Sequence, residues 1–296
     1  MPNVSAKAEP AGIESLKALK SSLAVRAKIA SSLRRAFEAA AFIETETPVG
    51  IFAPAAEEYI EAPKAASFFL RTSPELQMKR LLAAGMERIY QLGPCFRAGE
   101  NGRRHRPEFT MLEYYMTGAD YLELLDFTRG FLASICSDLY GSHRFRFGEN
   151  TIDIDKLEII PVREAFRRFA NEDADRCAEE DARFEFVLVD RIEPALPKDR
   201  PCVLMDYPVR FGAFARPKAS DPTLAERWEI QRARFRQFAE TRKKMNLAEY
   251  PEPTAFLEAI DAGIPPCAGA ALGFDRLVML LADKQDISEV AFPIDS

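Results

Sequence analysis

Residues 88–97 and 107–117 constrain the fold more than any other part of the chain, because both have the composition of strands and only a short arginine-rich loop separates them. Strands this close in sequence pair antiparallel, and their two-residue repeat decides which side chains share a face. One face of the return strand then carries the ring of Phe109, the carboxylate of Glu113 and the phenol of Tyr115. A strand facing only a core would rarely place a carboxylate in mid-row, because burying an unpaired charge costs several kcal/mol. We therefore expect this face to line a site beside the loop.

The loop concentrates positive charge in a chain whose net charge is −6. Its basic residues, all within ten positions, are Arg97, Arg103, Arg104, His105 and Arg106. A compact polyanion such as a triphosphate suits this cluster, because guanidinium groups bind phosphate oxygens in pairs. The alternative interpretation is a solvated hairpin tip, and the loop alone does not decide between the two.

Composition argues against several other classes of protein. The acidic net charge gives no global basic field for a long nucleic acid, so we do not expect tRNA as an obligatory partner. Five cysteines without a CxxC pair and only two histidines make a zinc site unexpected. The N-terminus lacks a signal-peptide core and no apolar run approaches the roughly 18 residues of a membrane span, so we expect a cytoplasmic protein with no membrane partner.

The last predicted strand, Ala268–Phe274, leads directly into a helix. Asp275 is in position to cap this helix, and Gly273 lets the backbone approach a ligand closely. Arg276 lies in the first turn, where the helix macrodipole adds to its own charge, so phosphate fits there. The alternative interpretation is an ordinary strand-to-helix corner with a surface arginine.

Apolar residues at spacings of three and four predict a long amphipathic helix from Leu16 to about Ala41. The remaining predicted elements are, in chain order, a strand over 42–48, a helix over 74–84 that Ser73 caps and Pro74 begins, a helix over 120–140, mixed short elements over 144–200, a buried strand over 202–207 and an exposed charged helix over 231–247.

The segments at about 23–50, 88–117 and 266–284 resemble, in this order, motifs 1, 2 and 3 of the class II aminoacyl-tRNA synthetases. The sequences FRAGENGRRHRPEFTMLEYY and GAALGFDRLVML carry the resemblance for motifs 2 and 3. It implies an α/β (α+β) catalytic domain over residues 13–296, with an antiparallel sheet flanked by helices, after a tail of residues 1–12. It also implies ATP-dependent activation of an amino acid and a homodimer built on motif 1.

Within this class the chain looks similar to lysyl-tRNA synthetases and to their shortened paralogue, the ligases that attach (R)-β-lysine to a lysine of elongation factor P. The chain starts directly at motif 1, without the anticodon-binding barrel of the synthetases, and SPELQMKRLL is closer to the paralogue. Ala271 stands where the synthetases have glycine and the paralogue has alanine. The resemblance therefore implies lysine or (R)-β-lysine as substrate and elongation factor P as acceptor.

The resemblance also implies a role for each matching residue. Arg97 and Arg276 are the expected catalytic residues, with Arg97 on the α-phosphate and the substrate carboxylate and Arg276 on the γ-phosphate. The expected ATP-binding residues are Arg97, Ala98, Gly99, Glu100, His105, Arg106, Phe109, Gly273 and Arg276. The expected amino-acid pocket consists of Ser73, Pro74, Glu75, Glu113, Tyr115 and Ala271. Glu229 matches a carboxylate that binds Mg²⁺ between phosphates.

Three departures from the family pattern affect the expected activity. Gly99 replaces a glutamate that contacts adenine, with Glu100 one place later as its candidate substitute, and Arg106 stands where asparagine is expected. After Ile230 the chain lacks a strand that in the family carries a second Mg²⁺ ligand and the glutamate for the distal ammonium of lysine. The gap means either that this strand is lost or that the given sequence omits residues of the natural chain. Three interpretations of function stay open: an active ATP-dependent ligase, a catalytically impaired or regulatory paralogue, and an enzyme for another amino acid.

Overall fold

The computed structural model describes residues 13–55, 60–212, 215–231 and 250–293. Its central sheet has the strand order β1-β5-β6-β13. The four strands are β1 (Ile43–Glu44), β5 (Arg88–Phe96), β6 (Glu108–Thr117) and β13 (Cys267–Gly273). β5 and β13 each pair antiparallel with β6, and β1 pairs parallel with β5. The predicted hairpin and the predicted antiparallel sheet are thereby confirmed.

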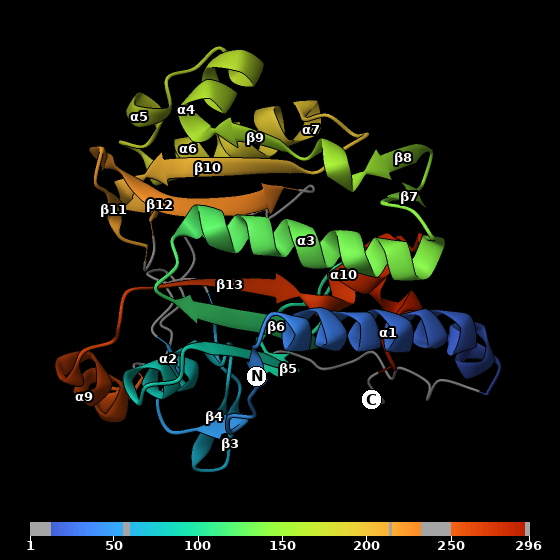
Figure 1. The fold of residues 1–296 in the computed structure, drawn as a ribbon, viewed down its shortest axis with the longest axis horizontal. Helices are drawn as coiled ribbons and strands as arrows, with labels where there is room; N and C mark the ends of the chain where they lie inside the picture. The colour runs from blue at the N-terminus through green and yellow to red at the C-terminus, as the bar shows by residue number, and fades with distance from the viewer. Residues whose placement is uncertain (1–12, 56–59, 213–214, 232–249, 294–296) are drawn as a thin grey trace, which may run out of the picture.

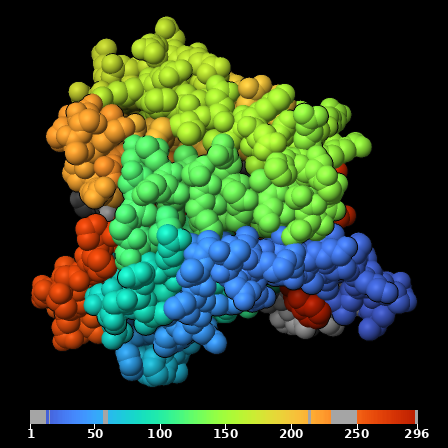
Figure 2. Space-filling model, viewed as in Figure 1, coloured from blue at the N-terminus to red at the C-terminus, as the bar shows by residue number. Residues whose placement is uncertain are grey.

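Two long helices, α1 (Ile13–Ala39) and α3 (Tyr121–Tyr140), lie side by side across one face of this sheet (Figure 1). Figure 2 shows them as adjoining bands on the surface of the molecule. Phe37 of α1 lies at the centre of the core beneath them, with its ring 4.5 Å from that of Tyr90 and 5.3 Å from that of Phe131. Because α1 and α3 cover this face, a site on the sheet has to use the other one.

A second sheet, with the order β11-β12-β10-β9, forms the upper part of the molecule in Figure 1. Its strands are β9 (Glu158–Pro161), β10 (Cys202–Pro208), β11 (Pro217–Lys218) and β12 (Asp221–Gln231). Its helices are α4 (Val162–Ala165), α5 (Ala174–Cys177), α6 (Asp181–Val187) and α7 (Glu193–Ala195), and they enclose a separate apolar core with β10. Every residue of β10 is buried, which confirms the buried strand predicted there.

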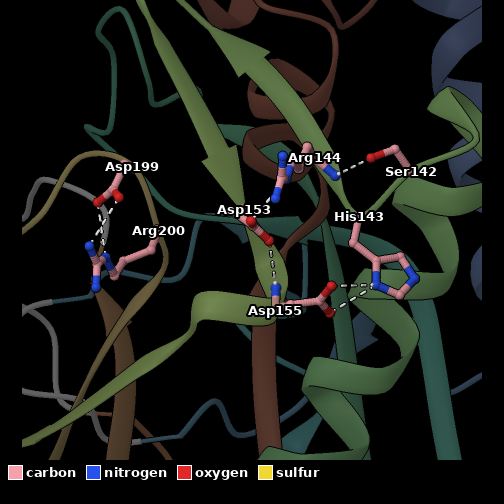
Figure 3. A network of polar contacts seen from close by, with 7 residues as sticks. All are labelled: Ser142, His143, Arg144, Asp153, Asp155, Asp199 and Arg200. Atoms are coloured by element: carbon pink, nitrogen blue, oxygen red, sulfur yellow. Dashed lines mark hydrogen bonds and ion pairs between the residues drawn. The ribbon is translucent and has the colours of Figure 1, made fainter.

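A polar network joins the end of α3 to this second sheet (Figure 3). It includes the hairpin of β7 (Arg144–Phe147) and β8 (Asn150–Asp153). Arg144 donates to the Asp153 carboxylate at 2.9 Å, and His143 pairs with Asp155 at 2.8 Å. The Asp153 amide donates to the Asp199 carbonyl at 2.9 Å, which connects the hairpin to the approach to β10.

A small sheet and the helices α2 (Glu75–Ala83) and α9 (Thr254–Ala262) lie in the lower part of the molecule in Figure 1. The small sheet contains β2 (Gly50–Ile51), β4 (Phe68–Leu70) and β3 (Lys64–Ala65) in that order, and α2 packs against α9. The strand β13 runs directly into α10 (Phe274–Leu281). No helix among the described residues is long and apolar enough to cross a membrane.

Three predicted details were wrong, and one cannot be compared. Only two residues of the predicted strand over 42–48 pair as β1, because side chains rather than a neighbouring strand bind the backbone at Thr47: Gln91 accepts from its amide and Arg71 donates to its carbonyl. The helix expected over 74–84 begins one residue later, at Glu75. Asp275 does not cap α10, because its carboxylate binds Arg26 and the Thr110 amide instead. The predicted helix over 231–247 lies almost entirely outside the described residues.

Candidate active site

The face of the central sheet opposite α1 and α3 has the carboxylate of Glu113 near its centre. Glu113 is only 2% exposed, and its two oxygens accept hydrogen bonds from Ser73 (2.7 Å) and Tyr115 (2.6 Å). In the strand register Ala271 lies directly opposite Glu113 on β13, and Gln91 lies opposite it on β5. The structure thus brings the predicted pocket residues together, on the face that the alternation of β6 predicts.

The pKa of Glu113 is raised to about 7, chiefly because the carboxylate is buried. The nearby charge of Glu75 also raises this pKa, whereas the hydrogen bonds from Tyr115 and Ser73 lower it. Glu75 begins α2 and pairs with Lys79 at 2.6 Å, and the Ser73 hydroxyl accepts from the Glu75 amide. A buried carboxylate of this kind gains from a bound ammonium, which would replace the solvation that the fold removes.

Tyr115 has room for its ring only because its cross-strand neighbour is a glycine. Gly269 lies opposite Tyr115, and a Cβ built on Gly269 would lie 2.3 Å from two ring atoms. Real Cβ contacts are never this short, so Gly269 fixes the position of the phenol that donates to Glu113. The sequence contains this glycine in motif 3, but only the register shows why it is needed.

The predicted phosphate-binding residues lie at the loop end of the same sheet. The Arg97 guanidinium lies 5.1 Å from the centre of the Phe109 ring and 3.4 Å from a Glu100 oxygen. Its Nε is buried without a hydrogen-bond partner, which is a costly state for a charged group. The pKa of Arg276 is lowered to about 10, chiefly by burial; the charge of Glu100 opposes this shift, and the positive charges of Arg97 and Arg104 add to it. An anion would satisfy both arginines, so this cluster fits a phosphate chain.

The loop between β5 and β6 folds onto the C-terminal part of the chain. Gly102 and His105 exchange two backbone hydrogen bonds across its tip, and the Arg103 carbonyl accepts from the Ile287 amide. Arg106 donates to the Phe292 carbonyl at 2.7 Å, so in this structure it anchors the loop. For three further predicted residues the structure gives backbone features. Gly99 has a φ of 77°, and the Ala98 amide donates to the Glu61 carbonyl. Gly273 is the residue directly before α10. Pro74 is buried at the start of α2.

The predicted metal ligand has a different setting. Glu229 lies on β12 in the second sheet and forms an ion pair with Arg227. Glu185 is close enough to interact electrostatically with Glu229: burial raises the pKa of Glu185, and the charge of Glu229 also raises it. Within the described part of the chain, no group of three or more Asp, Glu, His or Cys side chains could hold a metal ion. These residues do not fit a bound Mg²⁺.

Sequence reasoning missed a buried polar network beneath the pocket. Arg71 is 1% exposed and donates to the carbonyls of Pro94 (2.9 Å) and Thr47 (2.7 Å). Gln91, 2% exposed, accepts from the amide and hydroxyl of Thr47. The available signal was an arginine directly after the apolar run FFL, where solvent exposure is not expected.

Comparison with known families agrees with this geometry. The family model of class II tRNA synthetases (D, K and N) matches residues 13–296. The chain belongs to this family. Such class II synthetase-like ligases use ATP, in keeping with the arginine cluster.

Among curated relatives in the family, the chain is 32% identical to an elongation factor P–(R)-β-lysine ligase of Vibrio cholerae, over 92% of this chain and 95% of the relative. It is 33% identical to the ligase of the same name from Proteus mirabilis, over 91% and 94%. It is also 31% identical to a lysine–tRNA ligase of Dehalococcoides mccartyi, over 90% of this chain and 62% of that protein. The Vibrio alignment extends over 313 positions, more than the 296 residues of this chain, so that relative has residues without a counterpart here.

Proposed function

We propose that this protein activates lysine or (R)-β-lysine with ATP and transfers the aminoacyl group to a lysine of elongation factor P. The observation that carries the proposal is the shared face of β6, where the buried Glu113 carboxylate and the Arg97–Phe109 pair lie on one side of the same strand. An ammonium group and a nucleotide phosphate would thus bind side by side. Two of the relatives described above carry this activity in their names.

In the first step, a carboxylate oxygen of the amino acid attacks the α-phosphorus of ATP, and the bond to the β-phosphate breaks to release pyrophosphate. Glu113 holds the amino group, with Tyr115 and Ser73 fixing its orientation. Arg97 has a free donor for the negative charge that develops on the α-phosphate, and Phe109 offers a ring for adenine stacking. Positioning and electrostatics are sufficient, so no protein nucleophile is required.

In the second step, the ε-amine of the acceptor lysine attacks the acyl carbon, loses a proton, and displaces AMP. Because the acceptor is a translation factor, we place the reaction in the cytoplasm. We also propose a homodimer through motif 1, which sedimentation or size-exclusion analysis tests. Mg²⁺ is typical of the family, but the ion pair of Glu229 with Arg227 does not match a metal ligand, and we assign it no step.

The test is ATP–pyrophosphate exchange with lysine and with (R)-β-lysine, on a sample whose intact mass has been measured. We expect exchange with at least one of them, loss of exchange in Glu113→Gln, and a mass gain of one lysyl group on elongation factor P. A protein of 33.3 kDa that exchanges with neither amino acid would refute the proposal.

A second candidate is a catalytically impaired or regulatory paralogue. The residues missing relative to the Vibrio protein favour it, as does the pairing of Glu229 with Arg227. It predicts that the protein binds ATP without exchange. Formation of an adenylate by the purified protein would exclude it.

A further inference from the structure

Three residues from the three motif regions form a closed hydrogen-bonded ring behind the nucleotide site. Arg26 of α1 donates from Nη1 to the Asp275 carboxylate at 2.5 Å and from Nη2 to the Thr110 hydroxyl at 2.8 Å. The Thr110 amide donates to the other Asp275 oxygen at 2.7 Å. Each residue therefore contacts both of the others.

The ring lies in a partly buried, apolar setting. Asp275 is 3% exposed, and the Arg26 side chain is 22% exposed, with its guanidinium 4.9 Å from the centre of the Phe274 ring. In such a setting an ion pair is geometrically demanding, because each charge must be compensated by its partner. Arg26 donates through two nitrogens to two different residues, which a lysine ammonium could not do with the same geometry.

The sequence neighbours of this ring are the residues that face the nucleotide. Thr110 follows Phe109 on β6, and alternate residues of a strand point to opposite faces, so the ring lies behind the sheet while Phe109 lies in front. Asp275 precedes Arg276 in the first turn of α10. A shift of Asp275 relative to Thr110 therefore changes the separation between Arg276 and the Phe109 ring.

We infer that Arg26, Asp275 and Thr110 form a positioning unit that holds Phe109 and Arg276 at the separation needed to bind a nucleoside triphosphate. The inference rests on the proposed function only in taking ATP as the ligand. It makes α1, which contributes no residue to the predicted nucleotide site, part of the apparatus that sets ATP affinity. None of the three residues is a catalytic residue, because each acts through its neighbour.

The sign of one substitution separates this role from a purely electrostatic one. Asp275→Asn removes a negative charge beside Arg276, and by charge alone a more positive site would bind a polyanion more tightly. A positioning role predicts the opposite: ATP affinity falls about tenfold, because the neutral amide cannot hold the Arg26 guanidinium and the Thr110 amide as the carboxylate does. Arg26→Lys is expected to weaken ATP binding in the same direction, and Thr110→Val less, since it removes only the hydroxyl contact.

The experiment is a calorimetric titration of the purified full chain with ATP, followed by separate KM values for ATP and lysine in pyrophosphate exchange. The expected result is weaker ATP binding with an unchanged KM for lysine, and a double variant Arg26→Lys/Asp275→Asn no weaker than the worse single variant. The matched control is Arg34→Lys on the same helix, whose ion pair with Glu44 is exposed. It should leave ATP affinity unchanged.

Tighter ATP binding by Asp275→Asn would overturn the inference, and so would equal losses for ATP and lysine, which a general loss of structure produces. If Asp275→Asn does not fold, Thr110→Val carries the same test, and unchanged ATP affinity in that variant would overturn the inference. Unaltered protein that binds ATP but does not exchange would refute the proposed function alone. Unaltered protein that binds no ATP would refute both.

Discussion

At the scale of single residues, two charges on α2 act on Glu113 with opposite signs. The carboxylate of Glu75 raises the pKa of Glu113, and the ammonium of Lys79 lowers it. The two form an ion pair at 2.6 Å, and both side chains are largely buried. Glu113 also accepts hydrogen bonds from the Tyr115 and Ser73 hydroxyls and interacts electrostatically with the Cys95 thiol, and the Cys267 thiol lies near the α2 pair. The pocket charge therefore depends on α2 as well as on β6.

This opposition predicts a pair of pH shifts. Glu113 has to be ionised to bind an ammonium, so kcat/KM for the amino acid should rise with pH through the Glu113 pKa of about 7. Lys79→Met raises that pKa, and the rising limb should move to higher pH, with activity at pH near 6 falling several-fold. Glu75→Gln lowers the pKa and should move the limb to lower pH. The measurement is the pH profile of pyrophosphate exchange in each variant.

Lys79→Arg is the matched control, because it keeps the positive charge and should leave the limb near its original position. If both substitutions lowered activity at every pH without moving the limb, the α2 charges would be acting only on the structure of the pocket. Shifts of the same sign in Lys79→Met and Glu75→Gln would also contradict the prediction.

Gly269 supports a second prediction at this scale. In Gly269→Ala the new methyl group would meet the Tyr115 ring at 2.3 Å, so the ring has to move away from Glu113. We expect a loss of roughly 1–3 kcal/mol in unfolding free energy, as in other overpacked sites, together with a higher KM for the amino acid. Chemical denaturation and exchange kinetics measure the two effects.

Gly130→Ala is the comparison, because its Cβ would meet nothing within 4 Å on the exposed side of α3. An alanine in a helix interior should stabilise the protein by about 0.5–1 kcal/mol. If the two variants had equal stability, the register that places Gly269 against Tyr115 would be wrong.

At the scale of elements, Arg71 joins three segments that are separate in sequence. Arg71 itself lies in the segment between β4 and α2. Its side chain donates to the carbonyl of Thr47, after β1, and to the carbonyl of Pro94, on β5. We expect Arg71→Met to cost about 3 kcal/mol or more, because it leaves buried carbonyls without donors. Urea denaturation measures the loss. Arg129→Met should cost less than about 1 kcal/mol, because the ion pair of Arg129 with Asp126 is exposed; a similar loss in both variants would contradict the buried role of Arg71.

The same elements show which parts of the fold can be predicted from the sequence and which cannot. The β5–β6 hairpin and the faces of Phe109, Glu113 and Tyr115 followed from a local period of two, which needs no tertiary information. The length of β1 could not be predicted in this way, because the side chains of Arg71 and Gln91, which are distant in sequence, bind the backbone at Thr47. The cap role of Asp275 failed for the same reason: a partner on α1 competes for its carboxylate. Local patterns fix faces and periods, whereas long-range side-chain contacts decide ends and caps.

At the scale of the whole molecule, Trp228 connects the second sheet to the main apolar core. The main core lies under α1 and α3, and the second core lies between β10 and the helices α4 to α7. Trp228 is on β12 of the second sheet but packs against the main core, and its Nε1 donates to the Tyr121 carbonyl at 2.7 Å. Tyr121 in turn donates to Asp206 on β10 at 2.8 Å. Docking of the second sheet therefore relies on contacts at the start of α3.

This arrangement predicts that Trp228→Ala weakens one part of the molecule more than the other. The substitution removes a partly buried ring and its hydrogen bond, which should cost about 2–3 kcal/mol. Because the lost contacts hold the second sheet, native-state hydrogen exchange should accelerate in β10 while β6 keeps its protection. Phe186→Ala is the control, since its ring is 51% exposed and its loss should change neither strand. Equal acceleration in β6 and β10 would contradict this prediction and show that the two cores unfold as one cooperative unit. A substitution that destabilises the second sheet would then also destabilise the strand that carries the nucleotide site.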